Sequence, residues 1–414
     1  MADGAPSHLL SLPPEIREQI YSIIFHPDSN RLSRRDEYTD YDYRAALVLF
    51  RLNQQIYYES RKVFRDLNVF VRIETPWAEA AEHTAIVGHV PIVMQAQRAT
   101  QFPHASLDIS VEAPSISLHR EGEGRTHRFV ILLDDLEAFT QSWFYSSLSN
   151  PGLNQFLSTK LHLRDPYTPD WEEKHIPRQV QRRMLAPFGA IKGSRAFTVT
   201  GDPAPQPSLV AAIEAEQRIP VGSPESALVE ATRLKAEGNA LLTSAGCDAS
   251  SVRAALALYR RSWEAMYIVV KGRQRHVHAE AFFARELREP PYEGKNGQVE
   301  RLALRIQLVA NTCLAYLKLR DWDELRFWGM RTIALMRQAT GANDEDDSVT
   351  PEDEALLSFP SAVQVGKIYY RTAVAWRELG DRAQARRLLR VAAVYLPHDN
   401  IVKTELAACA LQIG

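Results

Sequence analysis

Hydrophobic residues in the second half of the chain recur at helical spacing and predict paired helices. The first helix begins at Ser223, which can cap it, and Pro224 suits its first turn. Gly246 can end this helix, and a second one follows over 254–270. The apolar face of the first helix carries four leucines: Leu228, Leu234, Leu241 and Leu242.

The same unit recurs twice, over 303–336 and 367–397. The three copies align on a small residue in each first helix: Gly238, Cys313 and Ala373. The facing positions of the second helices are Ala255, Leu325 and Ala385. Small residues allow the two helices of a pair to approach closely, and large ones such as Leu325 fill the space between them. The aligned positions therefore predict where each pair packs. The last stretch, 398–414, predicts a helix that covers the end of the array.

The first half of the chain has mixed patterning. Apolar residues at helical spacing predict a helix behind Pro13 and Pro14, and a second helix over 45–70 that runs into a strand. A strand followed by a helix is expected over 127–139. Between the halves, the Pro-, Gly- and Ser-rich stretch 201–226 predicts a linker. We therefore expect an α+β domain over 1–200, a linker over 201–224 and an all-α domain over 225–414.

Composition places the chain among ordinary soluble proteins. Of its 414 residues, 45% are apolar and 24% charged, and the net charge of -2 does not favour nucleic acid or an acidic membrane. The cysteines are few, odd in number and far apart, which favours a reducing compartment. No signal peptide and no membrane-spanning run is recognised. We expect a cytoplasmic protein, with the nucleus as a second location.

The paired-helix pattern resembles the tetratricopeptide repeat, a helix pair of about 34 residues that stacks into a solenoid. The resemblance implies three helix pairs plus a capping helix. The copies of this chain lie further apart than one repeat. The excess lies in 274–300, expected to hold longer helices and a loop, and in the acidic stretch 339–361, expected to be a mobile loop.

A narrower resemblance lies within these repeats. The segments LKAEGNAL, NTCLAYLKL, GKIYYR and VKTELAAC look like the repeat domain of large immunophilins and related co-chaperones. Such domains bind the C-terminal tails of the 90-kDa and 70-kDa heat-shock chaperones, which end in Glu-Glu-Val-Asp, through a carboxylate clamp of five residues. The matching positions carry the same residue types here: Lys235, Asn239, Asn311, Lys367 and Arg371.

The residue types suit the role that this resemblance implies. Lys235 and Asn239 are four residues apart and share a helix face, as do Lys367 and Arg371. Lysine and arginine bind carboxylates by charge-assisted hydrogen bonds, and an Asn amide offers both a donor and an acceptor. Solvated helix faces also carry such residues without binding anything, so a repeat scaffold with a lost or altered ligand stays open. Candidate apolar contacts for the upstream peptide are Tyr370 and Leu242.

The first half resembles fungal F-box-like domains. Leu12–Arg17 match the LPPEIR opening, Asn53–Glu59 a later NQQIY-x-E segment, and Asn68–Phe70 the exit into a strand. An F-box proper docks on the Skp adaptor of cullin ubiquitin ligases through an apolar helical surface. The resemblance implies four contacts here: Leu12, Pro13, Ile16 and Ile20. The same side chains could instead form the core of the domain, which is the commoner use of an apolar helix face.

No catalytic constellation, cofactor motif or metal site is recognised in the sequence. EGKNG lacks the spacing of a phosphate loop, and His276 and His278 have no second ligand cluster. The adjacent Asp134 and Asp135 are expected on a solvated surface. The basic stretch around Arg182 is too small for a nucleic-acid footprint. We therefore expect a protein that is not an enzyme.

Three functions remain open from the sequence. The first is a non-enzymatic scaffold whose repeats bind the tail of a heat-shock chaperone. The second is a substrate receptor of a cullin ubiquitin ligase, with the Skp adaptor as partner and the repeats recruiting substrate. The third is a repeat scaffold for an internal peptide, which would bind its ligand equally well with an amidated C-terminus.

Overall fold

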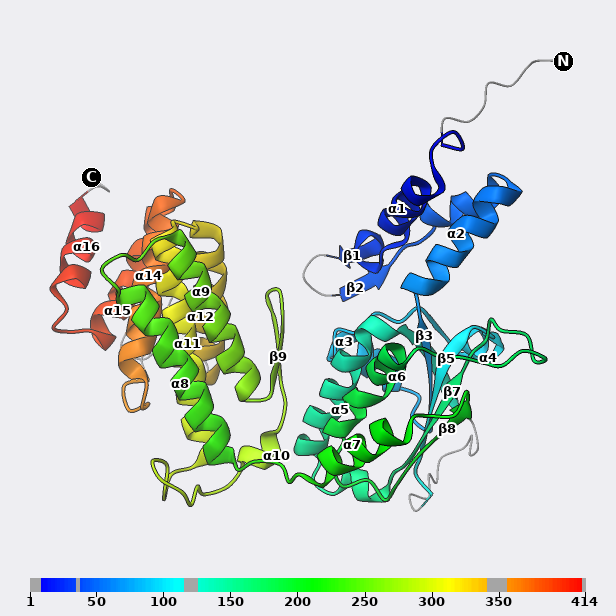
Figure 1. The fold of residues 1–414 in the computed structure, drawn as a ribbon. Helices are drawn as coiled ribbons and strands as arrows, with labels where there is room; N and C mark the ends of the chain where they lie inside the picture. The colour runs from blue at the N-terminus through cyan, green and yellow to red at the C-terminus, as the bar shows by residue number, and fades with distance from the viewer. Residues whose placement is uncertain (1–8, 35–37, 115–125, 341–355, 412–414) are drawn as a thin grey trace. The chain divides into compact units, whose positions relative to one another are not determined.

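The computed structural model describes residues 9–34, 38–114, 126–340 and 356–411. Contacts within the chain define two units (Figure 1). The N-terminal unit consists of Met1–Val221 and Val269–Ala281, and the helical unit of Gly222–Ile268 and Phe282–Gly414. The N-terminal unit is α+β, with a six-stranded mixed sheet, whereas the described part of the helical unit consists mainly of α-helices.

Two helices and a short hairpin form the first part of the N-terminal unit. Helix α1 buries Arg17, Tyr21 and Phe25, which lie four residues apart and so share one face. Ile56 and Val63 of α2 belong to the same core. The elements in order are α1 (Pro14–Phe25), η1 (Pro27–Asn30), β1 (Arg31–Arg34), β2 (Tyr38–Tyr41), η2 (Ala46–Arg51) and α2 (Gln54–Leu67).

The helix predicted over 45–70 divides into η2 and α2. Asn53 separates them with an extended backbone, φ -162°, and its side chain accepts a hydrogen bond of 2.9 Å from the backbone N–H of Ile56. An Asn at this position satisfies an unpaired N–H of the first helical turn. The cap therefore begins α2 within a run of apolar residues that by itself resembles one longer helix.

A partly buried ion pair joins α1 to α2. The Arg17 guanidinium donates to the two carboxylate oxygens of Glu59 over 2.9 and 2.6 Å, and to the backbone carbonyl of Leu12 over 2.5 Å. The Tyr21 hydroxyl donates to Glu59 over 3.2 Å. These contacts, with that of Arg17 first among them, lower the pKa of Glu59 to about 2. Arg17 and Glu59 thus join the segments Leu12–Arg17 and Asn53–Glu59 to each other.

The six strands of the main sheet run in the order β4-β6-β3-β5-β7-β8. The pairs β3/β5 and β7/β8 are parallel, and the other neighbours are antiparallel. The strands are β3 (Phe70–Thr75), β4 (Met94–Gln95), β5 (Ala105–Glu112), β6 (His127–Leu132), β7 (Ser158–Arg164) and β8 (Ala196–Asp202).

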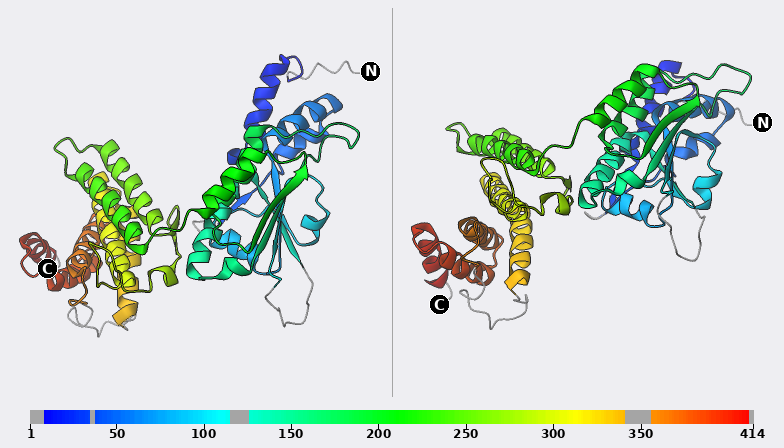
Figure 2. Two further views of the ribbon diagram at one scale, coloured as in Figure 1. Left: turned by 60° about the horizontal axis from the view of Figure 1, so that its bottom comes forward. Right: turned by 90° about the horizontal axis from the view of Figure 1, so that it is seen from below.

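Helices cover one face of this sheet (Figure 2). Val71 and Ile73 alternate along β3 and enter the main core of the unit, where they join Phe139 of α5, Met184 of α6 and Ile213 of α7. A smaller core forms around residues that point the other way: Phe70, Ala99, Val130 and Leu132. The helices and helical turns are α3 (Ala80–Ile86), α4 (Gln97–Gln101), η3 (Leu133–Asp135), α5 (Leu136–Ser149), η4 (Leu153–Phe156), α6 (Arg178–Leu185), η5 (Ala186–Ala190) and α7 (Pro207–Arg218).

The segment expected to be a linker is largely folded. Strand β8 extends to Asp202, and the next helix, α7, buries Ile213 in the main core of the N-terminal unit. The backbone N–H of Gln206 donates to the side chain of Gln181 over 3.1 Å. The Pro, Gly and Ser residues of 201–226 concentrate at the two ends of the segment. The average composition therefore gave no indication of the helix between them. The two units meet in sequence after Val221.

Within the described residues of the helical unit, three pairs of long helices are followed by one more long helix. Ser223 caps the first helix by accepting a hydrogen bond of 3.1 Å from the backbone N–H of Ser226. The small residues that align the copies, Gly238, Cys313 and Ala373, are all buried. The pairs are α8 (Pro224–Thr243) with α9 (Ala249–Ala265), α11 (Gly297–Leu319) with α12 (Trp322–Thr340), and α14 (Ala362–Glu378) with α15 (Arg382–Tyr395), before α16 (Asn400–Leu411).

A hairpin replaces helix after the first pair. The helix predicted over 254–270 ends at Ala265, and the β-branched residues that follow form β9 (Ile268–Lys271), which pairs with β10 (Gln274–Val277). The longer helices expected over 274–300 are therefore wrong in part, because α10 (Glu280–Phe283) is short. The acidic stretch expected to be a mobile loop falls mostly within 341–355, outside the described residues.

Candidate carboxylate-binding site

The five residues of the predicted clamp lie on the first helices of the three pairs. Lys235 and Asn239 lie on α8, Asn311 on α11, and Lys367 and Arg371 on α14. Helix α11 contacts both α8 and α14. The structure thus places the five on neighbouring helices of one unit.

The two asparagines contact each other directly. Asn311 Nδ2 donates to Asn239 Oδ1 over 2.7 Å, and the Tyr259 hydroxyl of α9 donates to the same oxygen over 2.8 Å. With its oxygen occupied twice, Asn239 has its Nδ2 donor left, and that group donates no hydrogen bond within the described residues. The pair therefore presents an amide donor.

Arg371 is held beside the asparagines. Its Nη1 donates to the backbone carbonyl of Ala310, the residue before Asn311, over 2.5 Å. Burial lowers the pKa of Arg371, and the neighbouring groups that oppose this shift are Cys313, Tyr370 and Tyr259. Burial raises the pKa of Cys313 to about 12, so this thiol carries no charge at neutral pH.

The two lysines differ in their surroundings. Lys235 is half-buried, donates to the side-chain oxygen of Gln307 on α11, and has its pKa lowered by burial. Lys367 is exposed and makes no hydrogen bond or ion pair within the described part of the chain. Four of the five predicted residues thus lie on α11 or form hydrogen bonds to it. Lys367, one helical turn before Arg371, forms none within the described residues.

The cations of this site have no carboxylate partner among the described residues. Other cations on the same helices do. Arg233 of α8 pairs with Glu230 and Glu237, and Arg377 of α14 pairs with Glu405. A half-buried cation without a counterion loses hydration and gains no ion pair in return. The site therefore has unbalanced positive charge that an anion could neutralise.

Two residues of this arrangement were not predicted from the sequence. Tyr259, on the second helix of the first pair, orients Asn239 through its hydroxyl. Its ring packs so close to α8 that a Cβ on Gly238 would lie 2.5 Å from it. Gln307 precedes Asn311 by four residues, the spacing of both clamp pairs, and that spacing was the available signal. Of the two candidate apolar contacts, Leu242 is buried in the core, which is a correction, and Tyr370 is half-buried.

Two of the predicted adaptor contacts, Ile16 and Ile20, lie on α1, and the other two, Leu12 and Pro13, precede it. Pro13 and Ile16 are exposed, the latter by 41%, while Leu12 and Ile20 are half-buried. The apolar residue one turn further, Ile23, is 69% exposed. These side chains are not the core of the unit, since α1 uses its opposite face for that.

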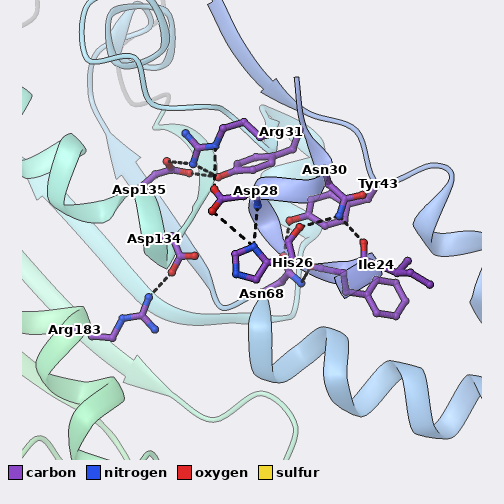
Figure 3. Close-up of polar contacts among 12 residues, drawn as sticks. Ile24, His26, Asp28, Asn30, Arg31, Tyr43, Asn68, Asp134, Asp135 and Arg183 are labelled. Carbon is purple, nitrogen blue, oxygen red and sulfur yellow. Dashed lines mark hydrogen bonds and ion pairs between the residues drawn. The ribbon is translucent and has the colours of Figure 1, made fainter. Parts of the chain in front are cut away.

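Of the paired aspartates, Asp134 is exposed, as expected, whereas Asp135 is not. Asp135 is buried and accepts hydrogen bonds from Arg31 over 3.0 Å and from the Tyr41 hydroxyl over 2.8 Å (Figure 3). Burial, the largest influence, raises its pKa. Asp134 pairs with Arg183. The two join the β1/β2 hairpin and α6 to the turn before α5, a contact between distant segments that sequence spacing cannot reveal.

The described residues include no group of three or more His, Cys, Asp or Glu side chains that could hold a metal ion. Within the same residues, α11 is long and apolar enough to cross a membrane by length and composition alone. A core helix of a soluble protein passes the same test, and α11 contacts α8, α9, α12 and α14.

Comparison of the chain with protein-family models, with curated proteins and with solved structures finds no match.

Proposed function

We propose that the helical unit is a tetratricopeptide-repeat solenoid that binds the free C-terminal carboxylate of a partner's tail. The partner is a 90-kDa or 70-kDa heat-shock chaperone, whose tail ends in Glu-Glu-Val-Asp. In this proposal the chain is a non-enzymatic scaffold of the cytoplasm, with the nucleus as a second location, and requires no cofactor.

The observation that carries the proposal is the set of cations without carboxylate partners around the two asparagines. Lys235, Lys367 and Arg371 bring three positive charges, while the described residues bring no compensating carboxylate. A terminal aspartate carries two carboxylates, one on its main chain and one on its side chain. Such a residue would supply the missing negative charge through charge-assisted hydrogen bonds.

Each group has a distinct role in this proposal. Arg371 has one nitrogen occupied by the Ala310 carbonyl and retains other donors for a carboxylate oxygen. Asn239 contributes its Nδ2 group to the peptide. Lys367, which is exposed, reaches the ligand from the rim, and Lys235 exchanges its contact with Gln307 for the ligand.

Calorimetry with a Glu-Glu-Val-Asp peptide tests the proposal. We expect micromolar affinity, about -8 kcal/mol, for the free acid and none for the amidated peptide. Lys367→Ala should weaken binding because it removes an exposed charge without disturbing the core. Lys318→Ala is the matched control, since Lys318 is also exposed, at the end of α11. Equal affinity for acid and amide would favour an internal peptide as the ligand and contradict the clamp.

A second candidate function concerns the N-terminal unit. The exposed apolar side chains of α1, Ile16 and Ile23 above all, favour docking of the Skp adaptor and a role as a ubiquitin-ligase receptor. Changing both to Ser should abolish co-purification of that adaptor and leave tail binding intact. If the adaptor fails to co-purify with the unmodified chain, this candidate is wrong. Both functions can coexist, because they use different units.

A further inference from the structure

A second group of cations without carboxylate partners among the described residues lies in the N-terminal unit. A cavity of about 430 Å³ beside α5 is mostly apolar, whereas a larger one of about 730 Å³ combines arginines with aromatic walls. We call the larger one the aromatic–arginine pocket. Its walls include Tyr43, Phe50, Phe64, Phe70 and Phe102.

Two arginines of α2 enter this pocket one helical turn apart. Arg61 donates to the Tyr57 hydroxyl over 2.7 Å, and its guanidinium lies 5.2 Å from the centroid of that ring. Arg65 lies 4.0 Å from the centroid of the Tyr167 ring. Neither arginine forms an ion pair within the described residues.

A histidine lies near the two arginines. His104 stacks on Tyr167 with ring centroids 5.5 Å apart and also lines the pocket. Burial, followed by the charges of Arg65 and Arg61, lowers the pKa of His104, which favours the neutral imidazole. The positive potential of the pocket therefore comes from the two guanidiniums, and the uncharged ring of His104 adds to its aromatic wall.

Carboxylates in the pocket do not neutralise these arginines. Asp42 is engaged by Arg44, whose guanidinium donates to both of its oxygens. Asp40 accepts a hydrogen bond from the backbone N–H of Tyr41 over 2.8 Å. Like charges one helical turn apart repel each other, so α2 carries an electrostatic cost here that a bound anion would relieve.

We propose that the aromatic–arginine pocket binds a small aromatic phosphate of the nucleoside monophosphate class. The volume suits a small-molecule ligand. Guanidinium groups match phosphate oxygens in geometry and charge, and flat aromatic walls suit a base. Arg61 and Arg65 hold the phosphate, and Tyr167 and Phe102 contact the ring.

Titration calorimetry of the full chain with three related compounds tests separately whether the pocket recognises the phosphate and whether it recognises the base. AMP carries both base and phosphate, ribose 5-phosphate lacks the base, and adenosine lacks the phosphate. We expect AMP to bind at least tenfold more tightly than either of the others. No binding of AMP, or affinity for one of the partial compounds equal to that of AMP, would overturn the proposal.

Substitutions on α2 provide the second arm. Arg61→Gln and Arg65→Gln should each weaken AMP binding at least tenfold, while Lys62→Gln, an exposed neighbour outside the pocket, should leave it within twofold. Circular dichroism of each variant checks the fold, and either arginine variant alone suffices if the other does not fold. Unchanged affinity in a folded arginine variant would contradict the assignment.

Discussion

Two arginines, one in each unit, have similar surroundings but different partners. Arg17 and Arg371 each lie on a helix next to the core and donate to a backbone carbonyl over 2.5 Å. Arg17 also has Glu59, whereas Arg371 has no carboxylate among the described residues. The contrast separates a charge that is satisfied within the fold from one that is available to a ligand.

The asparagines repeat this contrast. Asn68 donates to the backbone carbonyls of Phe25 and Phe64 and accepts a hydrogen bond from the Tyr43 hydroxyl. Both its nitrogen and its oxygen therefore have partners within the N-terminal unit. Asn239 accepts two hydrogen bonds at its oxygen and keeps its nitrogen for other contacts. Buried polar groups with complete partners stabilise a fold, and incomplete ones point to a site.

The largest effect is expected for Arg371→Met. Tail affinity should fall by about 2–5 kcal/mol, because a charge partner of the ligand carboxylate is lost. The free energy of unfolding should change by less than about 1 kcal/mol, because no carboxylate is left unpaired. Calorimetry and denaturant unfolding measure the two quantities. A variant that binds normally but unfolds easily would make Arg371 structural, like Arg17.

Arg17→Met should show the opposite behaviour. It leaves the Glu59 carboxylate without its main partner and should destabilise the N-terminal unit by about 2–3 kcal/mol, less than a fully buried pair because Glu59 is partly exposed. Hydrogen exchange over 14–67 locates the loss, and tail binding should stay unchanged. Protection equal to that of the unmodified chain would remove the distinction between the two arginines.

Acid should weaken the N-terminal unit through Glu59. Its pKa lies at about 2 in the folded protein, below the ordinary value of 4.5, so the contribution to stability is complete above about pH 4.5 and is lost as pH falls towards 2. After a discount for partial exposure we expect about 1–2 kcal/mol. Unfolding measured from pH 6 to 2.5 should show this loss, and Glu59→Gln should lack it.

The smallest effect is expected from salt. Raising ionic strength from about 0.05 to 0.5 M should weaken tail binding severalfold, about 1 kcal/mol, because the exposed charge of Lys367 is screened. The stability contributed by the partly buried pair of Arg17 and Glu59 should respond less to salt. Affinity that is independent of salt would argue against an electrostatic clamp, and Lys367→Ala should reduce the salt dependence.

Local patterns predicted much of the secondary structure but not where segments end. The helix caps at Ser223 and Asn53 use residue types that signal a helix start, yet only the first was recognised, because Asn53 lies within an apolar run. The strand that begins at Ile268 was assigned to a helix for the same reason, because the apolar pattern continues past the end of α9 at Ala265. The helix at 207–218 was missed because flanking prolines dominated the composition.

The sequence by itself determined the residue types of the candidate clamp and their spacing, because i,i+4 pairs share a helix face whatever surrounds them. Tertiary structure decided which of these side chains meet. Only the packing of α8, α9 and α11 places Tyr259 and Asn311 on one oxygen of Asn239, and only that of α11 and α14 places Arg371 on Ala310. The same holds for Asp135 and for the aromatic–arginine pocket, since charge balance depends on neighbours that are distant in sequence.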